Sequence, residues 1–218
     1  MNTLIIGGSS GLGLELAKQL SDKYKVYVTG RTNPNEQGLE FISFNIAYKT
    51  LPEDVDELLK QLPEIDFLIH AAGFFQDGTL SDLSDDDIFL MDAVGLLAPT
   101  FLLQRLLKKQ NKLDHFIAVT STSQWTPRLK EPVYTAVKAG LGMLANSVSL
   151  DERVGKVMVA GPAGMKTKFW LNTDKDTTTM LEPKWVAEQI LDQYKEDFNY
   201  KYVRLLREPA RVEIMEKR

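Results

Sequence analysis

The sequence predicts a single-domain α/β fold in which a doubly wound parallel sheet lies between two layers of helices. Along the chain, short apolar segments alternate with amphipathic segments of helical periodicity, as a parallel sheet with crossover helices requires. The chain has 218 residues, of which 44% are hydrophobic, so it can bury the core of one domain. It contains no internal repeat, low-complexity tract or linker that would indicate a second domain.

The N-terminal segment predicts a strand, a turn and a helix in succession. Residues 1–6 end in an apolar run long enough for a buried strand, and residues 14–20 have the pattern of an amphipathic helix. Between them, Gly7 to Gly13 follow the spacing Gly-x-x-x-Gly-x-Gly. Backbone N–H groups and the helix dipole at such a turn point toward an anion, and glycines allow it to approach. This segment therefore predicts a phosphate-binding site, with a plain tight turn as the alternative.

The remaining elements follow from the positions of apolar runs and helical patterns. Strands are expected at residues 25–29, 41–44, 67–70, 116–119, 156–160 and 201–206. Helices are expected at residues 51–61, 84–109 and 133–150, and we expect the second of these to bend near Pro99. The polar stretch 172–179 predicts a loop.

Two residues in the last of these helices suggest acid–base chemistry. Tyr134 and Lys138 are four residues apart, so they project from one helix face. A phenol has an unperturbed pKa of about 10, and a nearby ammonium group lowers that pKa by stabilising the phenolate. Such a pair can donate a proton to a carbonyl oxygen or accept one from an alcohol. Taken alone, the spacing also fits a solvated helix face.

The glycine spacing, followed by the Tyr-x-x-x-Lys pair, resembles the short-chain dehydrogenase/reductase family. The resemblance runs from about Thr3 to about Thr167 and is weaker toward the C-terminus. It implies a Rossmann-type fold and hydride transfer between a nicotinamide cofactor and a carbonyl or alcohol substrate. The family also has a serine upstream of the tyrosine. Ser121 stands at that spacing, with Ser123 as the reserve candidate.

The resemblance assigns a role to each of these residues. It implies that Tyr134 is the acid/base, that Lys138 lowers its pKa and binds the nicotinamide ribose, and that Ser121 holds the substrate oxygen. The expected cofactor-binding positions are Gly7, Ser9, Ser10, Gly11, Leu12, Gly13, Arg31, Thr32, Asn45, Ile46, Ala71, Ala72, Gly73, Tyr134, Lys138, Pro162, Met165 and Thr167.

The end of the second expected strand indicates which cofactor is used. An acidic residue there binds a free ribose 2′-hydroxyl, whereas arginine attracts a 2′-phosphate. Gly30 stands where family members that use NAD carry the acid, and Arg31 follows it. Ser9 and Thr32 add hydroxyl donors. We therefore expect NADP(H); the alternative is that Arg31 stacks on the adenine of NAD.

One departure from the family pattern concerns the proton path. Gly95 stands where the family commonly carries an asparagine, which is thought to hold a water that links the lysine to solvent. The departure leaves either an enzyme with an altered proton path or a protein that is losing catalysis. The presence of Ser121, Tyr134 and Lys138 favours the enzyme. Milder departures are Asn45, His70, Ala71 and Ala163.

Two other function classes compete with a reductase. A non-catalytic NADP-binding regulatory or structural protein can share the fold. A sugar-nucleotide epimerase or dehydratase shares the Tyr-x-x-x-Lys pair, but about fifty residues beyond Thr167 are too few for its substrate domain. An apolar or aromatic carbonyl compound is the expected substrate class if aromatic residues line the pocket. The candidates for that lining are Trp125, Phe74, Phe75, Phe169 and Trp170.

Composition bounds the partners. A net charge of −4 does not suggest a nucleic-acid partner, and no apolar run approaches the length of a membrane span. With no cysteine and two histidines, we expect no metal site and a cytoplasmic location. We expect a homodimer or homotetramer formed through helices 84–109 and 133–150, with a monomer as the alternative. The apolar content of these helices exceeds what one sheet face needs. At 100° per residue the following five cannot all point at the sheet: Leu141, Met143, Leu144, Val148 and Leu150.

Overall fold

Eight strands form one sheet in the computed structural model, which describes residues 1–171 and 173–218. Their order is β3-β2-β1-β4-β5-β6-β7-β8, and all are parallel except β8, which runs antiparallel to β7. The strand order reverses between β1 and β4, and ligands of open α/β sheets bind at such a switch point. The strands are β1 (Asn2–Ile6), β2 (Lys25–Gly30), β3 (Leu39–Ser43), β4 (Phe67–His70), β5 (Leu113–Val119), β6 (Val154–Pro162), β7 (Tyr200–Leu206) and β8 (Arg211–Lys217).

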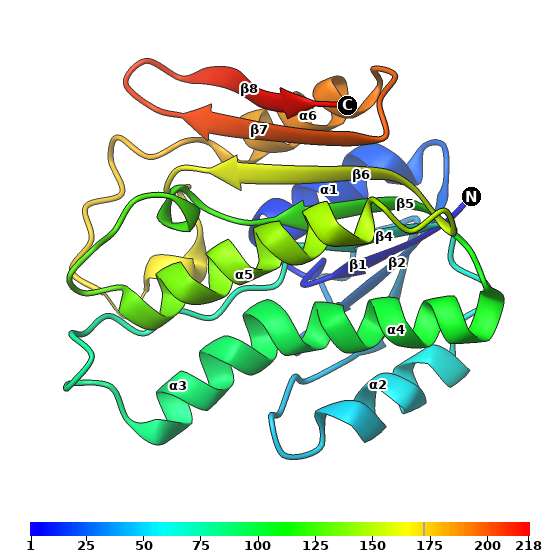
Figure 1. The fold of residues 1–218 in the computed structure, drawn as a ribbon, viewed down its shortest axis with the longest axis horizontal. Helices are drawn as coiled ribbons and strands as arrows, with labels where there is room; N and C mark the ends of the chain where they lie inside the picture. The colour runs from blue at the N-terminus through cyan, green and yellow to red at the C-terminus, as the bar shows by residue number, and fades with distance from the viewer. Residues whose placement is uncertain (172) are drawn as a thin grey trace.

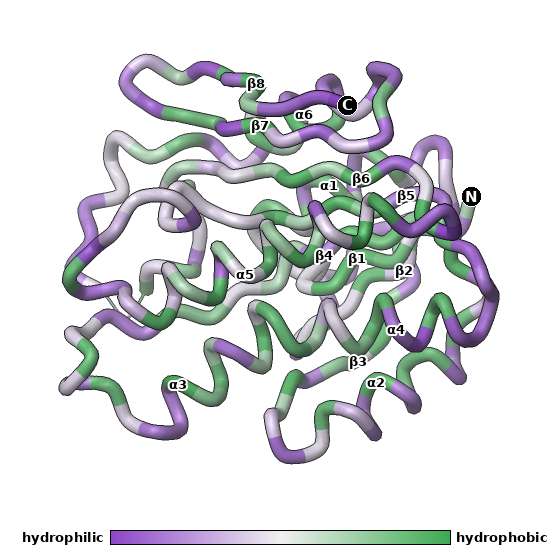
Figure 2. Tube along the Cα trace, in the orientation of Figure 1, coloured by the Kyte–Doolittle hydropathy of each residue, from purple (hydrophilic) through white to green (hydrophobic). Residues whose placement is uncertain are grey.

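Helices cover both faces of this sheet, as Figure 1 shows. On one face α2 (Leu51–Lys60), α4 (Ala98–Gln110) and α5 (Pro132–Val148) bury their apolar residues in one core cluster. On the other face α1 (Gly11–Ser21) and α6 (Pro183–Tyr194) share a second cluster. Figure 2 shows the central strands as largely hydrophobic, which is typical of a parallel sheet buried on both faces. The expected three-layer Rossmann-type fold is confirmed.

The expected strands and helices are present, mostly with longer bounds, and the structure adds α6 and β8. β8 forms a hairpin with β7 and covers that edge of the sheet. Its sequence places one or two apolar residues at a time between charged ones and lacks a longer apolar run. Most of its residues are accordingly exposed, which explains why the pattern of apolar runs misses this strand.

A π-helical turn interrupts the long helix that was expected over residues 84–109. The segment runs through α3 (Asp85–Asp92), a π-turn at Ala93–Leu97, and α4. We expected a bend near Pro99, and the irregularity lies just before it. Proline has no N–H to donate to the carbonyl four residues earlier, which is that of Gly95. The wider turn is a common response to such a break, and functional sites frequently carry one.

No helix in the described part of the chain is both long enough and apolar enough to cross a membrane.

Candidate active site

A large cavity lies at the carboxyl ends of the central strands. Its volume is about 1790 Å³, and its wall contains the glycine turn, the end of β5 and the start of α5. Every residue that the sequence singled out for catalysis or cofactor binding lines this cavity. The fold therefore brings together positions that are as far apart in the chain as Gly7 and Thr167.

The glycine turn between β1 and α1 requires its glycines. Gly7 has a φ of +79°, and a Cβ there would lie 2.7 Å from the backbone of Ala72. A Cβ on Gly13 would overlap with the carbonyl oxygen of Gly7. These glycines let the turn pack tightly, and the start of α1 lines the cavity, where the backbone N–H groups of a helix N-terminus suit an anion such as a diphosphate.

The end of β2 fits a ribose that carries a phosphate. A Cβ on Gly30 would overlap with the Ser9 hydroxyl, so an acidic side chain has no room at this position while Ser9 stays in place. Arg31 and Thr32 are exposed and line the same cavity. The donors here are a guanidinium and two hydroxyls, a set that suits a 2′-phosphate.

Lys138 lies one helical turn after Tyr134 on α5 and is almost completely buried. Its ammonium nitrogen is 5.6 Å from the centroid of the Tyr134 ring and donates a hydrogen bond of 3.1 Å to the carbonyl of Val119. Burial lowers the pKa of Lys138 to about 8, because the charged form loses its hydration. Its charge is therefore sensitive to pH in the mildly alkaline range.

The pKa of Tyr134 is raised, which corrects the expectation that Lys138 lowers it. Burial is the main cause, since the phenolate would be poorly solvated. The Ser121 hydroxyl lowers this pKa, and the charge of Glu131 raises it further. Sequence spacing predicts that Tyr134 and Lys138 share a face but says nothing about desolvation. With its proton held at neutral pH, Tyr134 suits proton donation to a carbonyl oxygen.

The two candidate serines follow β5 and differ in their partners. Ser121 accepts a hydrogen bond from the backbone N–H of Ser123 at 3.1 Å, and its hydroxyl is 3.3 Å from that of Ser123. Ser123 is buried and donates to the carboxylate of Glu131 at 2.8 Å. The hydroxyl of Ser123 is thus committed to Glu131, which leaves Ser121 as the serine that can contact a substrate beside Tyr134.

Glu131, Arg128 and Lys175 also line the cavity, and the sequence analysis did not identify them. Glu131 is only 4% exposed and lies one helical turn before Tyr134. That spacing puts it on the Tyr134 face of α5, which is the signal that could have identified it. Lys175 belongs to the loop expected at residues 172–179, of which Asn172 lies outside the described residues.

Aromatic side chains pack around Tyr134. Phe75 lies edge-on to Tyr134 at 5.3 Å between centroids, and it also contacts Phe169 and Trp170. Phe74, Phe169 and Trp170 line the cavity, as expected. Trp125 is not among the lining residues, because it packs beneath the guanidinium of Arg204, 4.0 Å from its ring.

His70 stands at the end of β4 and makes a hydrogen bond to the π-turn. Its Nε2 lies 3.0 Å from the carbonyl oxygen of Val94 in the π-turn. Burial lowers the pKa of His70 to about 3, and the charge of Lys138 adds to this effect. The neutral imidazole therefore ties β4 to the π-turn, and no chemistry needs to be assigned to it.

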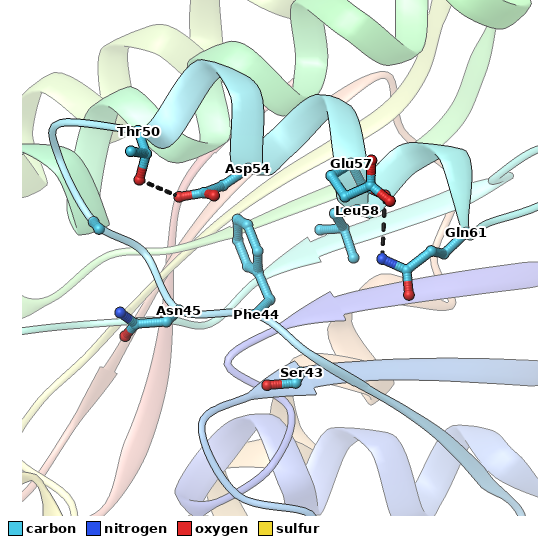
Figure 3. A pocket seen from close by; sticks show the side chains of 9 residues that line it. Ser43, Phe44, Asn45, Thr50, Asp54, Glu57, Leu58 and Gln61 are labelled. Atoms are coloured by element: carbon cyan, nitrogen blue, oxygen red, sulfur yellow. Dashed lines mark hydrogen bonds between the residues drawn. The ribbon is translucent and has the colours of Figure 1, made fainter.

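A second, smaller cavity of about 340 Å³ lies between the end of β3 and α2. Figure 3 shows Asn45 at its edge, together with the hydrogen bond of 2.7 Å from Thr50 to Asp54. Asn45 lines both cavities, and the resemblance assigns it to the adenine end of the cofactor. The smaller cavity thus adjoins the candidate cofactor site.

Comparison with known proteins identifies the class that this fold and site define. The family model described as short chain dehydrogenase matches residues 1–178. The chain therefore belongs to the short-chain dehydrogenase family, whose members are oxidoreductases that act on alcohols and carbonyl compounds with nicotinamide cofactors.

Individual relatives are similar over most of their length. An uncharacterised oxidoreductase of Staphylococcus epidermidis is 27% identical over 206 residues, covering 86% of this chain and 88% of the relative. A serine dehydrogenase complexed with NADP⁺ superposes with a TM-score of 0.76 at 20% identity, covering 93% of this chain and 94% of the other. A 4-hydroxyisoleucine dehydrogenase complexed with NADH superposes with a TM-score of 0.76 at 20% identity, covering 93% of this chain and 96% of the other. These structures share the fold, and they contain different nicotinamide cofactors.

Proposed function

We propose that this protein is an NADP(H)-dependent oxidoreductase that interconverts a carbonyl compound and its alcohol by a Ser-Tyr-Lys mechanism. One observation carries the proposal: Ser121, Tyr134, Lys138 and the glycine turn line a single cavity at the switch point of the sheet. A non-catalytic cofactor-binding protein has no need for such a constellation, so this alternative is not favoured.

Different residues of the cavity bind different parts of the cofactor. The glycine turn at the start of α1 holds the diphosphate, and Arg31 with Ser9 and Thr32 binds the 2′-phosphate. Lys138 binds the ribose next to the nicotinamide. When bound, the nicotinamide supplies or accepts the hydride. Pro162, Met165 and Thr167 line the same cavity and would hold its ring.

The side chains of this protein contribute one chemical step, the transfer of a proton to or from the substrate oxygen. Tyr134, protonated because burial raises its pKa, donates its proton to the carbonyl oxygen as that oxygen becomes an alkoxide. Ser121 hydrogen-bonds the same oxygen and fixes its position. Lys138 stabilises the tyrosinate that is left. In the reverse direction Tyr134 accepts the proton of the alcohol.

The aromatic wall supports a substrate with an apolar or aromatic group. Phe169 and Trp170 line the cavity, and Phe75 packs behind them against Tyr134. Such a wall excludes water from the reacting atoms and favours an apolar substituent on the carbonyl carbon.

A turnover screen tests the proposal. Purified protein is mixed with a panel of aryl and alkyl aldehydes and ketones, with NADPH and separately with NADH, and the absorbance of the reduced nicotinamide is followed. We expect NADPH-dependent reduction of at least one aryl carbonyl compound. Absence of turnover across the panel with both cofactors would overturn the proposal.

A further inference from the structure

Glu131 is a buried carboxylate that the mechanism above does not use. It stands at the N-cap position of α5, where its side chain makes no capping hydrogen bond, and it lines the cavity one turn before Tyr134. Its two oxygens have different partners. Oε2 accepts a hydrogen bond of 2.8 Å from the Ser123 hydroxyl, whereas Oε1 lies 3.5 Å from both Arg128 Nη1 and Lys175 Nζ.

The contact with Ser123 is the strong one of the three. A hydrogen bond to a charged carboxylate at 2.8 Å is short and charge-assisted. The two ion pairs are longer, and their cations are partly exposed, so solvent weakens them. Glu131 is therefore tied first to the serine pair and only second to the cations.

Counting donors gives the direction of each proton in this chain of contacts. A carboxylate can only accept, so the single hydroxyl proton of Ser123 points to Glu131. Ser123 can then only accept from Ser121, whose oxygen lies 3.3 Å away. The proton of Ser121 therefore points to Ser123. The Ser121 oxygen also accepts the backbone N–H of Ser123, which leaves one lone pair for the Tyr134 hydroxyl or a ligand.

The direction of the Ser121 proton matters because the carbonyl compound needs a hydrogen-bond donor, whereas the alcohol can use an acceptor. A carbonyl oxygen can only accept a hydrogen bond, whereas an alcohol can also donate one. On the basis of the function proposed above, we propose that Glu131 is a positioning residue. Through Ser123 it sets Ser121 as an acceptor, and so it favours binding of the alcohol over binding of the carbonyl compound. The Ser121–Ser123 contact exceeds the usual O–H···O distance of about 2.7–2.8 Å, so a carbonyl compound can still draw the proton away.

Glu131→Gln reverses the direction without removing the side chain. Arg128 and Lys175 both donate toward Oε1, so the amide oxygen of the glutamine takes that place and its NH₂ group faces Ser123. Ser123 then accepts from the glutamine and donates to Ser121. The proton of Ser121 is freed for a carbonyl oxygen.

The test measures binding in complexes that cannot react. Acetophenone is titrated into the protein with NADP⁺, and 1-phenylethanol into the protein with NADPH, by isothermal titration calorimetry. We expect Glu131→Gln to bind acetophenone about three- to tenfold more tightly and 1-phenylethanol more weakly by a similar factor, which is the range for one neutral hydrogen bond. Unchanged constants, or a parallel weakening of both probes, would overturn the inference.

A double-mutant cycle separates positioning from a structural role. Ser123→Ala removes the middle link, so it should also tighten acetophenone binding. Adding Glu131→Gln to the Ser123→Ala variant should then leave the dissociation constants of both probes as they are in Ser123→Ala. If Glu131 acts only by holding Arg128 and Lys175, its effect persists in the Ser123→Ala background, and the inference fails. Glu216→Gln, an exposed carboxylate on β8, is the matched control and should leave both constants unchanged.

The outcome also separates this inference from the proposed function. A wild-type protein that binds both probes but turns over no carbonyl compound contradicts the function, while the comparison of binding constants still stands. A wild-type protein that binds neither probe overturns the inference, whereas the proposed function is then decided by the turnover screen.

Discussion

Val137 occupies the space that any side chain at position 95 would need. A Cβ built on Gly95 overlaps with Cγ1 of Val137, because the π-turn packs directly against α5. Val137 immediately precedes Lys138, so this contact lies beside the candidate proton path. Glycine at 95 and valine at 137 are therefore two parts of one packing arrangement.

Introducing the family's asparagine at position 95 should consequently destabilise the protein unless a smaller residue replaces Val137. From the sequence we expected Gly95→Asn, if the helix accepts it, to leave activity equal or higher. The structure indicates that Gly95→Asn alone overpacks this contact and lowers the free energy of unfolding by about 1–3 kcal/mol. Gly95→Asn combined with Val137→Ala should recover part of that loss. Urea denaturation measures both, with Val137→Ala alone as the control. A single variant as stable as the wild type would contradict the packing argument.

Tyr134→Phe tests the proton donor. The ring and its contacts with Phe75 and Phe169 remain, while the only proposed acid is lost. We expect kcat for carbonyl reduction to fall by about 10²–10⁴-fold, the range for general acid catalysis. The dissociation constant for NADPH should hardly change, and its measurement serves as the control. An active wild type whose Tyr134→Phe variant keeps full turnover would falsify the assigned mechanism.

The lowered pKa of Lys138 predicts a limb in the pH profile. As pH rises through about 8, Lys138 in the free enzyme loses its proton and its charge. The pKa of Tyr134 is raised, so Tyr134 stays protonated over the same range. We therefore expect kcat/KM for reduction to fall as pH rises through about 8. Lys138→Arg keeps its charge at every accessible pH, and its residual activity should lack this limb. A limb that persists in Lys138→Arg would assign it to another group.

Arg31 should decide between the two nicotinamide cofactors. Arg31→Met keeps an extended side chain and removes the charge that faces the 2′-phosphate. We expect NADPH to bind about ten- to a hundredfold more weakly, with little change for NADH. Titration calorimetry with both cofactors measures this. Arg105→Met, at a salt bridge with Asp56 outside the cavity, is the control. Equal affinities of the wild type for both cofactors would contradict the NADP(H) assignment.

Self-association through the helical segments 84–109, which spans α3 and α4, and 133–150, which contains α5, also remains a prediction. Met143 is 64% exposed on α5 and Leu150 is 72% exposed just after it, and apolar residues on such a surface favour a partner. Leu141 is buried in the core, so of the five apolar residues it is one that faces the sheet. Light scattering at micromolar concentration should give a multiple of 24.6 kDa, and Met143→Glu should shift the mass toward the monomer. A wild-type mass near 24.6 kDa would contradict the prediction.

Local patterns in the sequence were sufficient for the fold class, and the resemblance to the family supplied most of the positions that meet in the cavity. Apolar runs and helical periodicity mark the parallel strands and most helices, because a strand buried on both faces must be apolar throughout. The glycine turn is equally local: a positive φ at Gly7 and close backbone contact at Gly13 leave no room for another residue. A strand such as β8, half exposed and rich in charge, carries no such signal.

Only the tertiary structure decided how the site residues affect one another. The pKa of Tyr134 depends on how far packing removes the phenol from water, and this desolvation outweighs any effect of the spacing to Lys138. The overlap between position 95 and Val137 depends on the packing of the π-turn against α5. Likewise, the alignment of Glu131, Ser123 and Ser121 depends on where β5 ends relative to the start of α5. Distances between elements that are remote in sequence set burial and hydrogen bonding, and no local pattern encodes them.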